Sequence, residues 1–188
     1  MAHRLERGVA VSLTASSITA FALKYGFKAL VKIPAVRKGY WRGHCSIEKT
    51  ADGWIVTNDT ADPCRLYVPA LGLDYAFGVD GKPFATDLGS IPEILQGAKY
   101  LHLKPDDYPK TYTTHDWGYK FEGIYVSHPD ANDWHFVRVD RREADIIMYI
   151  GLCSEGATLA DSQAIYRGVR MFGNSAWQSH RREDAAKA

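Results

Sequence analysis

The chain has 188 residues, and its 23 Lys and Arg against 22 Asp and Glu give a formal net charge of +1. Hydrophobic residues make up 46% and charged residues 24% of the sequence, a balance typical of a globular domain that excludes wholesale disorder and collagen-like repeats. Proteins that hold a long phosphate backbone usually carry a clear basic excess, so this charge predicts no strong nucleic-acid binding. The three cysteines, at positions 45, 64 and 153, include no Cys-x-x-Cys pair, which excludes a zinc ribbon and predicts reduced thiols.

Residues 1–44 are predicted to form an N-terminal arm or helix that packs on this chain or on a neighbouring subunit. Residues 8–23 carry no charged side chain, but five Ser and Thr make this stretch only weakly apolar. A membrane-spanning helix needs about 20 predominantly apolar residues, more than this stretch offers. We therefore expect no transmembrane span. The rest of the chain is expected to form one globular domain over residues 45–173.

Residues 45–86 have the pattern of short strands separated by turns. The predicted strands are 46–48, 54–57, 65–68, 73–77 and 83–86. Asp52 and Gly53 lie between the first two strands, and this pair is typical of a tight β-hairpin turn. A turn at residues 79–82 lies between the last two strands and predicts a second hairpin. Strands at this spacing indicate an antiparallel sheet.

The second half of the chain has helical periodicity. After Pro109, the residues Tyr112, His115 and Tyr119 recur at steps of three and four, so their side chains share one face of a helix. This periodicity predicts that the segment containing His115, Asp116 and Tyr119 lies on a helix. The side chains on this helix face can then contact the same neighbouring helix or strand.

Two further helices follow. Capping-box sequences at residues 140–143 and 158–161 predict their starts, and glycines near the ends predict that they stop near Gly156 and at Gly173. The polar segment 174–188 is predicted to be a tail that frays or docks elsewhere. Antiparallel hairpins followed by a three-helix C-terminal half indicate an α+β fold in one domain.

The sequence His-Asp-Trp-Gly-Tyr that begins at His115 carries the first candidate chemistry. A His and an adjacent Asp on one helix can face the same cavity, with His115 as a base and Asp116 as a metal ligand. Tyr119 follows one turn later, where its hydroxyl reaches a partner on a neighbouring helix. The alternative is a half-buried histidine that bonds to a backbone carbonyl, beside a solvated aspartate.

Asp145 lies inside an apolar helical run, between Ala144 and Ile146. A buried carboxylate costs several kcal/mol unless it is paired, so Asp145 needs a histidine or an arginine as its partner. If the partner is His115, the two form a base and an orienting carboxylate that activate water or a hydroxyl. If the partner is an arginine, Asp145 is structural. The candidate arginines are Arg141, Arg142 and Arg167.

Residues 86–92 predict a tight loop in which Asp87 and several carbonyl oxygens converge on a hard cation, because such ions prefer several oxygen ligands. The alternative is a turn in which Asp87 or Ser90 caps local amides. In the first interpretation Asp87 joins Asp116 as a metal ligand. Ser90 and Trp117 are then the candidate substrate contacts.

Four segments, in this order and at this spacing, resemble the phage and prophage family called domain of unknown function 1353. The segments are 83–92, 115–119, 142–145 and 166–173. The resemblance covers roughly residues 47–173, and it implies a phage origin and an unassigned role. Residues 1–44 fall outside the pattern of that family.

The His-Asp-x-x-Tyr pattern is also similar to that of phospholipase A2, including the disulfide-free domain of parvovirus capsids. In that family one helix carries the pattern and a second helix supplies an aspartate that orients the histidine. The resemblance implies His115 as the base for an attacking water, Asp116 as a calcium ligand, and Tyr119 and Asp145 as the rest of the network. The chain departs from the pattern by an insertion at residues 125–139 and by lacking a glycine-rich calcium loop.

These residues predict a phage-encoded, metal-assisted hydrolase of an ester or phosphoester, with a divalent cation, calcium first, as its cofactor. The alternative is a non-enzymatic virion or tail component whose N-terminal arm binds neighbouring subunits. Expected partners are other phage proteins, a second copy of the chain, or a lipid or host component. The expected location is the cytoplasm of the host bacterium, with incorporation into the virion under the alternative.

Overall fold

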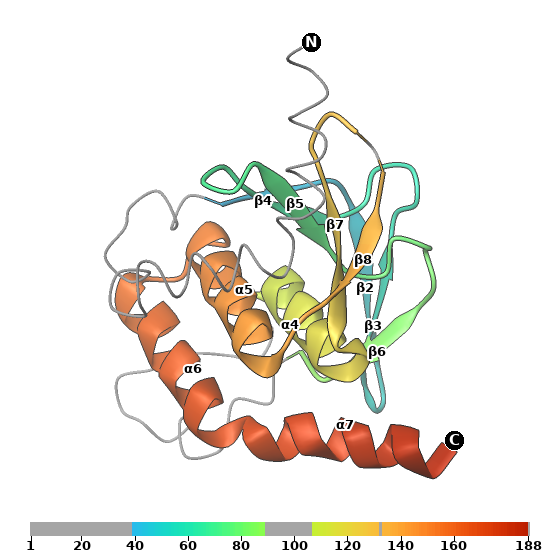
Figure 1. Cartoon of the computed structure of the whole chain (residues 1–188), viewed down its shortest axis with the longest axis vertical. Coiled ribbons are helices and arrows are strands. Elements are labelled where there is room, and N and C mark those ends of the chain that lie inside the picture. The colour runs from blue at the N-terminus through green and yellow to red at the C-terminus, as the bar shows by residue number, and fades with distance from the viewer. Residues whose placement is uncertain (1–38, 89–106, 132, 188) are drawn as a thin grey trace.

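A computed structural model describes residues 39–88, 107–131 and 133–187 (Figure 1). Antiparallel strands in two sheets are followed by helices, which confirms the predicted α+β class. Most of the predicted N-terminal arm and the candidate substrate contact Ser90 lie outside the described residues. The part of the arm that is described already belongs to the fold, since its first strand starts at Tyr40.

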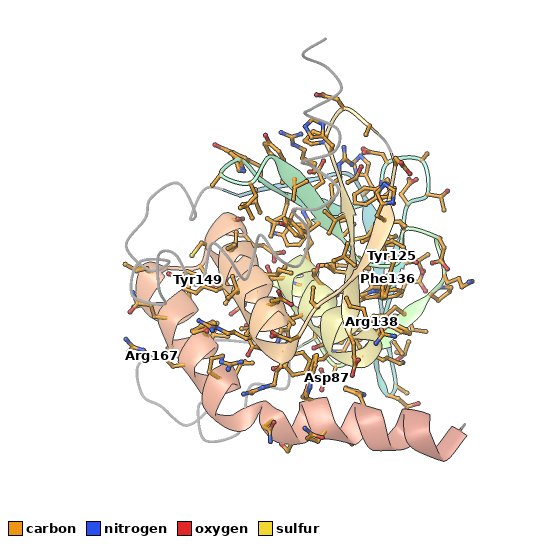
Figure 2. All side chains as sticks on the ribbon, viewed as in Figure 1. Asp87, Tyr125, Phe136, Arg138, Tyr149 and Arg167 are labelled. Carbon is orange, nitrogen blue, oxygen red and sulfur yellow. The ribbon has the colours of Figure 1, made fainter. Side chains whose placement is uncertain are left out.

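The larger sheet has five strands in the order β1-β4-β5-β7-β8, and every neighbouring pair is antiparallel. Its strands are β1 (Tyr40–Arg42), β4 (Arg65–Val68), β5 (Leu73–Ala76), β7 (Gly123–Ser127) and β8 (His135–Arg138). The last two strands form a hairpin over residues 123–138, which contains most of the segment 125–139 identified above as an insertion. Figure 2 shows Tyr125 of β7 and Phe136 of β8 side by side, with their ring centroids 5.2 Å apart.

The smaller sheet contains β2 (Cys45–Thr50), β3 (Gly53–Asn58) and β6 (Phe84–Thr86). The hairpin of β2 and β3 confirms the first predicted hairpin. The second predicted hairpin is wrong, because β5 pairs with β4 and β7 whereas β6 pairs with β3. All four residues of β5 are buried, so this strand needs a neighbour on each side. At Gly78 the chain adopts a left-handed φ of 42° beside the Trp117 ring and leaves for the other sheet.

The described helices are α4 (Pro109–Phe121), α5 (Arg141–Ser154), α6 (Leu159–Phe172) and α7 (Asn174–Lys187). Asp140 and Glu143 form the predicted capping box of α5, and Thr158 caps α6 by accepting a hydrogen bond from the Asp161 amide. The segment expected to be a polar tail is helical, and its buried Trp177 packs edge-on against Tyr119 with centroids 5.1 Å apart. One buried aromatic side chain thus anchors a helix whose composition is otherwise polar.

The helices stack in a fixed order on the larger sheet. Contacts join α4 to β7, α4 to α5, and α5 to α6, so α5 lies in the middle of the helical layer (Figure 1). One apolar core fills the space between the larger sheet and α4 and α5. A second core lies under the smaller sheet, where Trp117 of α4 meets Val56 and Phe84. Helix α4 therefore contributes to both cores.

The capping box gives a test of the helical layer. Replacement of Asp140 by Ala removes the carboxylate that accepts from the Glu143 amide at 2.8 Å. We expect a loss of about 1 kcal/mol in the free energy of unfolding and a fall of about 2–4 °C in Tm. Urea and thermal denaturation measure both quantities. The exposed Ser46→Ala is the matched control, and equal stabilities of the two variants would contradict this account of the α5 start.

Candidate active site

Asp145 is fully buried in α5, and three donors from the two flanking helices surround its carboxylate. His115 Nε2 of α4 lies 3.0 Å from Oδ1, and the Tyr119 hydroxyl donates to the same oxygen at 2.6 Å. Arg170 of α6 donates from its guanidinium to Oδ2 at 2.7 Å. Both oxygens of this buried carboxylate are therefore bonded to charged or polar partners, as burial requires.

The structure brings His115 and Asp145 together, which is one of the two arrangements that the sequence left open. It also adds a guanidinium, from Arg170, which was not among the arginines considered. Arg141 instead donates to the Val169 and Arg170 carbonyls at the end of α6. Arg167 is exposed and lies on the outer side of α6, away from α5 (Figure 2). No local pattern singles out Arg170, because its guanidinium meets Asp145 only through the packing of α6 on α5.

Close approach of α4 and α5 makes the contact possible. Gly118 faces Ala144 where the two helices meet, and a Cβ on Gly118 would lie 3.4 Å from the Ala144 Cβ. His115 and Tyr119 are four residues apart on α4, so both reach the same carboxylate from one helix face. Their rings also pack on each other, with centroids 4.1 Å apart.

The network is charged at neutral pH. Burial tends to raise the pKa of Asp145, but the hydrogen bonds and charge of His115, with those of Tyr119 and Arg170, hold that pKa below its ordinary value. Burial tends to lower the pKa of His115, yet Asp116 and Asp145 together raise it to about 9. Burial and the Asp145 charge raise the pKa of Tyr119, which keeps its hydroxyl a donor.

Asp116 lies on the other side of the His115 ring, with its Oδ1 3.7 Å from Nδ1. Its Oδ2 accepts a hydrogen bond from the Thr86 hydroxyl, and Thr86 in turn accepts from the Leu88 amide at 3.0 Å. Leu88 has a φ of 51°, an unusual conformation for a branched side chain. Backbone strain of this kind gathers at functional sites, so we regard this turn as the wall of the site nearest Asp116.

Calcium was expected from the sequence, and residues 89–92 of its candidate loop lie outside the described residues. Within the described residues no group of three or more His, Cys, Asp or Glu side chains is placed to hold a metal ion. Both oxygens of Asp116 already face Thr86 and His115, and Asp87 is exposed. We therefore derive no chemical step through a cation, and the metal roles of Asp87 and Asp116 stay predictions.

Trp117 lies in the second core rather than beside the His115 ring. Its indole packs against Phe84, Phe121 and Tyr125, with ring centroids 5.2, 4.3 and 6.3 Å away. Its Nε1 is buried and has no hydrogen-bond partner among the residues that the structure describes. The structure thus gives Trp117 a packing role, and its predicted contact with a substrate stays a prediction.

Comparison with known proteins adds no relative: no family model, curated protein or solved structure matches the chain. None of the helices in the described ranges combines the length and apolar character of a membrane span. The geometry around Asp145 is therefore the main indication of what the protein does.

Removal of the Asp145 carboxylate tests how much the network contributes to the free energy of unfolding. Asp145→Ala leaves His115, Tyr119 and Arg170 without their common acceptor, and loss of one partner from a buried charged network costs about 3–5 kcal/mol. We expect that loss in urea denaturation, and a smaller one for Asp145→Asn, which keeps one acceptor oxygen. Asp130→Asn on the surface is the control. A loss below 1 kcal/mol for Asp145→Ala would contradict the network described here.

The raised pKa of His115 predicts a pH dependence of stability. The folded protein holds the imidazole proton up to about pH 9, whereas the unfolded chain releases it near the ordinary value of 6.5. This contribution is therefore complete below pH 6.5 and is lost as the pH rises through 9. At about 1.4 kcal/mol per pKa unit it is on the order of 3 kcal/mol.

Urea denaturation at pH 6 and pH 10 measures this contribution as the difference between wild type and His115→Asn. The variant serves as the control because every other titrating group is common to both proteins. An equal loss of stability in the two proteins would show that His115 has no raised pKa.

Proposed function

We propose that the chain is a hydrolase of an ester or phosphoester bond in which His115 is the general base. The observation that carries the proposal is the 3.0 Å contact of His115 Nε2 with a buried, ionised Asp145. A carboxylate on one ring nitrogen fixes the tautomer and orientation of an imidazole, so that the other nitrogen takes up a proton. The similarity to the His-Asp-x-x-Tyr pattern of phospholipase A2 supports the same assignment.

In this proposal His115 Nδ1 removes a proton from a water molecule as its oxygen attacks the carbonyl carbon or the phosphorus. Asp145 stabilises the imidazolium that forms, because its Oδ1 accepts from the protonated Nε2. The imidazolium then returns the proton from Nδ1 to the leaving alcohol. Tyr119 and Arg170 keep Asp145 ionised and in place, and they act as positioning residues.

The raised pKa of His115 sets the pH range of this chemistry. At neutral pH the ring is mostly protonated and does not accept a proton, and the neutral base becomes the main form only above about pH 9. We therefore expect kcat/KM to rise from neutral pH with a midpoint near pH 9, and to level off only above that pH. A rise centred near 6.5 would show that Asp116 and Asp145 do not act on the ring as described.

The test uses the full chain with a p-nitrophenyl ester, bis-p-nitrophenyl phosphate and phosphatidylcholine vesicles, each with EDTA and with added calcium. We expect His115→Ala to lower kcat/KM by about 10²–10⁴-fold, with native circular dichroism retained. The exposed His128→Ala is the matched control and should leave activity unchanged. Hydrolysis that survives His115→Ala would contradict the proposed base, and the calcium arm tests the cation that the resemblance implies.

A second proposal is a non-enzymatic virion or tail component, since Arg170 gives Asp145 the partner of a purely structural ion pair. Under this proposal the chain hydrolyses none of the three substrates, either with EDTA or with added calcium. Mass spectrometry of purified phage particles then detects it, and deletion of residues 1–38 removes its association with other subunits. The phage origin and host cytoplasm belong to both proposals, and they rest on the family resemblance.

A further inference from the structure

Cys45 and Cys64 are neighbours although 18 residues separate them in the sequence. The residues before them, His44 and Pro63, form a parallel bridge. The His44 amide donates to the Asp62 carbonyl at 2.9 Å, and the His44 carbonyl accepts from the Cys64 amide at 3.1 Å. Cys45 and Cys64 are the next positions in this register, and side chains in register on parallel segments point to the same side.

Asn58 holds this arrangement in place. It lies directly opposite Cys45 in the β2–β3 hairpin and is buried. Its side chain accepts from the Cys64 amide at 2.6 Å and donates to the Phe77 carbonyl at 2.6 Å. Cys45 and Cys64 then pack in one apolar cluster, Cys64 fully buried and Cys45 partly exposed.

We propose that Cys45 and Cys64 are a redox pair that closes to a disulfide in the folded protein. Neighbouring chains in register lie about 4.8 Å apart, within the Cα separation of roughly 4.4–6.8 Å that disulfides span. The bond would tie β2 of the smaller sheet to the segment that enters β4 of the larger sheet. This inference does not depend on the proposed hydrolase activity.

The surroundings make Cys45 the attacking sulfur. A hydrogen bond from the Cys64 thiol lowers the pKa of Cys45; the Lys110 charge adds to this effect, whereas burial and Glu155 oppose it. The same hydrogen bond and burial raise the pKa of Cys64. A thiolate is the nucleophile in thiol–disulfide exchange, so the partly exposed Cys45 reacts first and the buried Cys64 second.

Glutathione disulfide is the class of oxidant that balances the reaction. The Cys45 thiolate attacks one of its sulfurs, which forms a mixed disulfide and releases one glutathione thiolate that takes up a proton. Cys64 then loses its proton, and its sulfur attacks the Cys45 sulfur and releases the second glutathione. The protein loses two electrons and two protons, and glutathione disulfide gains them to become two glutathione thiols.

The experiment incubates the full reduced chain in glutathione buffers of increasing oxidised fraction, traps free thiols with N-ethylmaleimide and measures intact mass and linked peptides. We expect a loss of 2 Da (two hydrogens), a Cys45–Cys64 linked peptide, and alkylation at Cys153 alone. Oxidation should raise Tm by several degrees, and dithiothreitol should reverse the rise. Cys153→Ser, whose native thiol contacts Ser162 of α6, is the matched control and should behave as wild type.

Cys45→Ser should abolish both the mass loss and the Tm shift. Cys64→Ala removes the other partner of the same bond and should have the same two effects, so the proposal stays testable if one of the two variants does not fold. Alkylation of all three cysteines in the fully oxidising buffer, with native circular dichroism retained, would overturn the proposal. So would a glutathione adduct at Cys45 that never resolves, or a disulfide that includes Cys153.

Discussion

The buried carboxylate of Asp145 is the constraint on which the helical layer depends. It lies in the middle helix, α5, among apolar neighbours, where an unpaired charge would cost several kcal/mol. Its donors come from both flanking helices: His115 and Tyr119 from α4, and Arg170 from α6. Because hydrogen bonds tolerate little misalignment, these contacts fix α4 and α6 relative to α5 more tightly than apolar packing alone would.

The same contacts give the histidine its chemical character. Arg170 bonds to Oδ2 of Asp145, and His115 and Tyr119 share its Oδ1. The second ring nitrogen of His115, Nδ1, faces Asp116. Two carboxylates against one guanidinium leave an excess of negative charge beside the ring, which is why its pKa rises although burial favours the neutral form. The arrangement that stabilises the helices thus also keeps the imidazole protonated at neutral pH, and under the proposed function it would confine the role of His115 as a base to alkaline pH.

Elements coded by neighbouring residues could be predicted from the sequence, and elements coded by distant contacts could not. The Asp140 capping box, the Thr158 cap and the turn before Gly53 each involve residues a few positions apart, and all three occur as expected. The pairing of β5 with β7 joins residues about 50 positions apart and depends on the burial of β5 on both faces. Segment 174–187 is helical, and its Trp177 docks on Tyr119, a residue far away in the sequence.

The candidate site was likewise predictable from the sequence only where neighbouring residues define it. An acid within an apolar run requires a partner, which predicts the need for a contact at Asp145 but leaves the choice between His115 and an arginine open. The fold uses both, and the arginine is a residue whose significance appears only when α6 lies against α5. Cys45 and Cys64 are a second case, since neither belongs to a motif and only the register of residues 44 and 63 joins them.

Helix α4 contacts both the Asp145 network and the apolar core that contains Cys45 and Cys64. One face carries His115 and Tyr119 toward α5, and another carries Trp117 into the core that holds both cysteines. Thr86 at the end of β6 bonds to Asp116, and β6 pairs with β3, which pairs with β2 and Cys45. A bond between Cys45 and Cys64 would therefore constrain the sheet that positions Asp116 beside the His115 ring. The smaller sheet thus contacts α4 beside the charged network through Thr86, and it carries Cys45 of the thiol pair on β2.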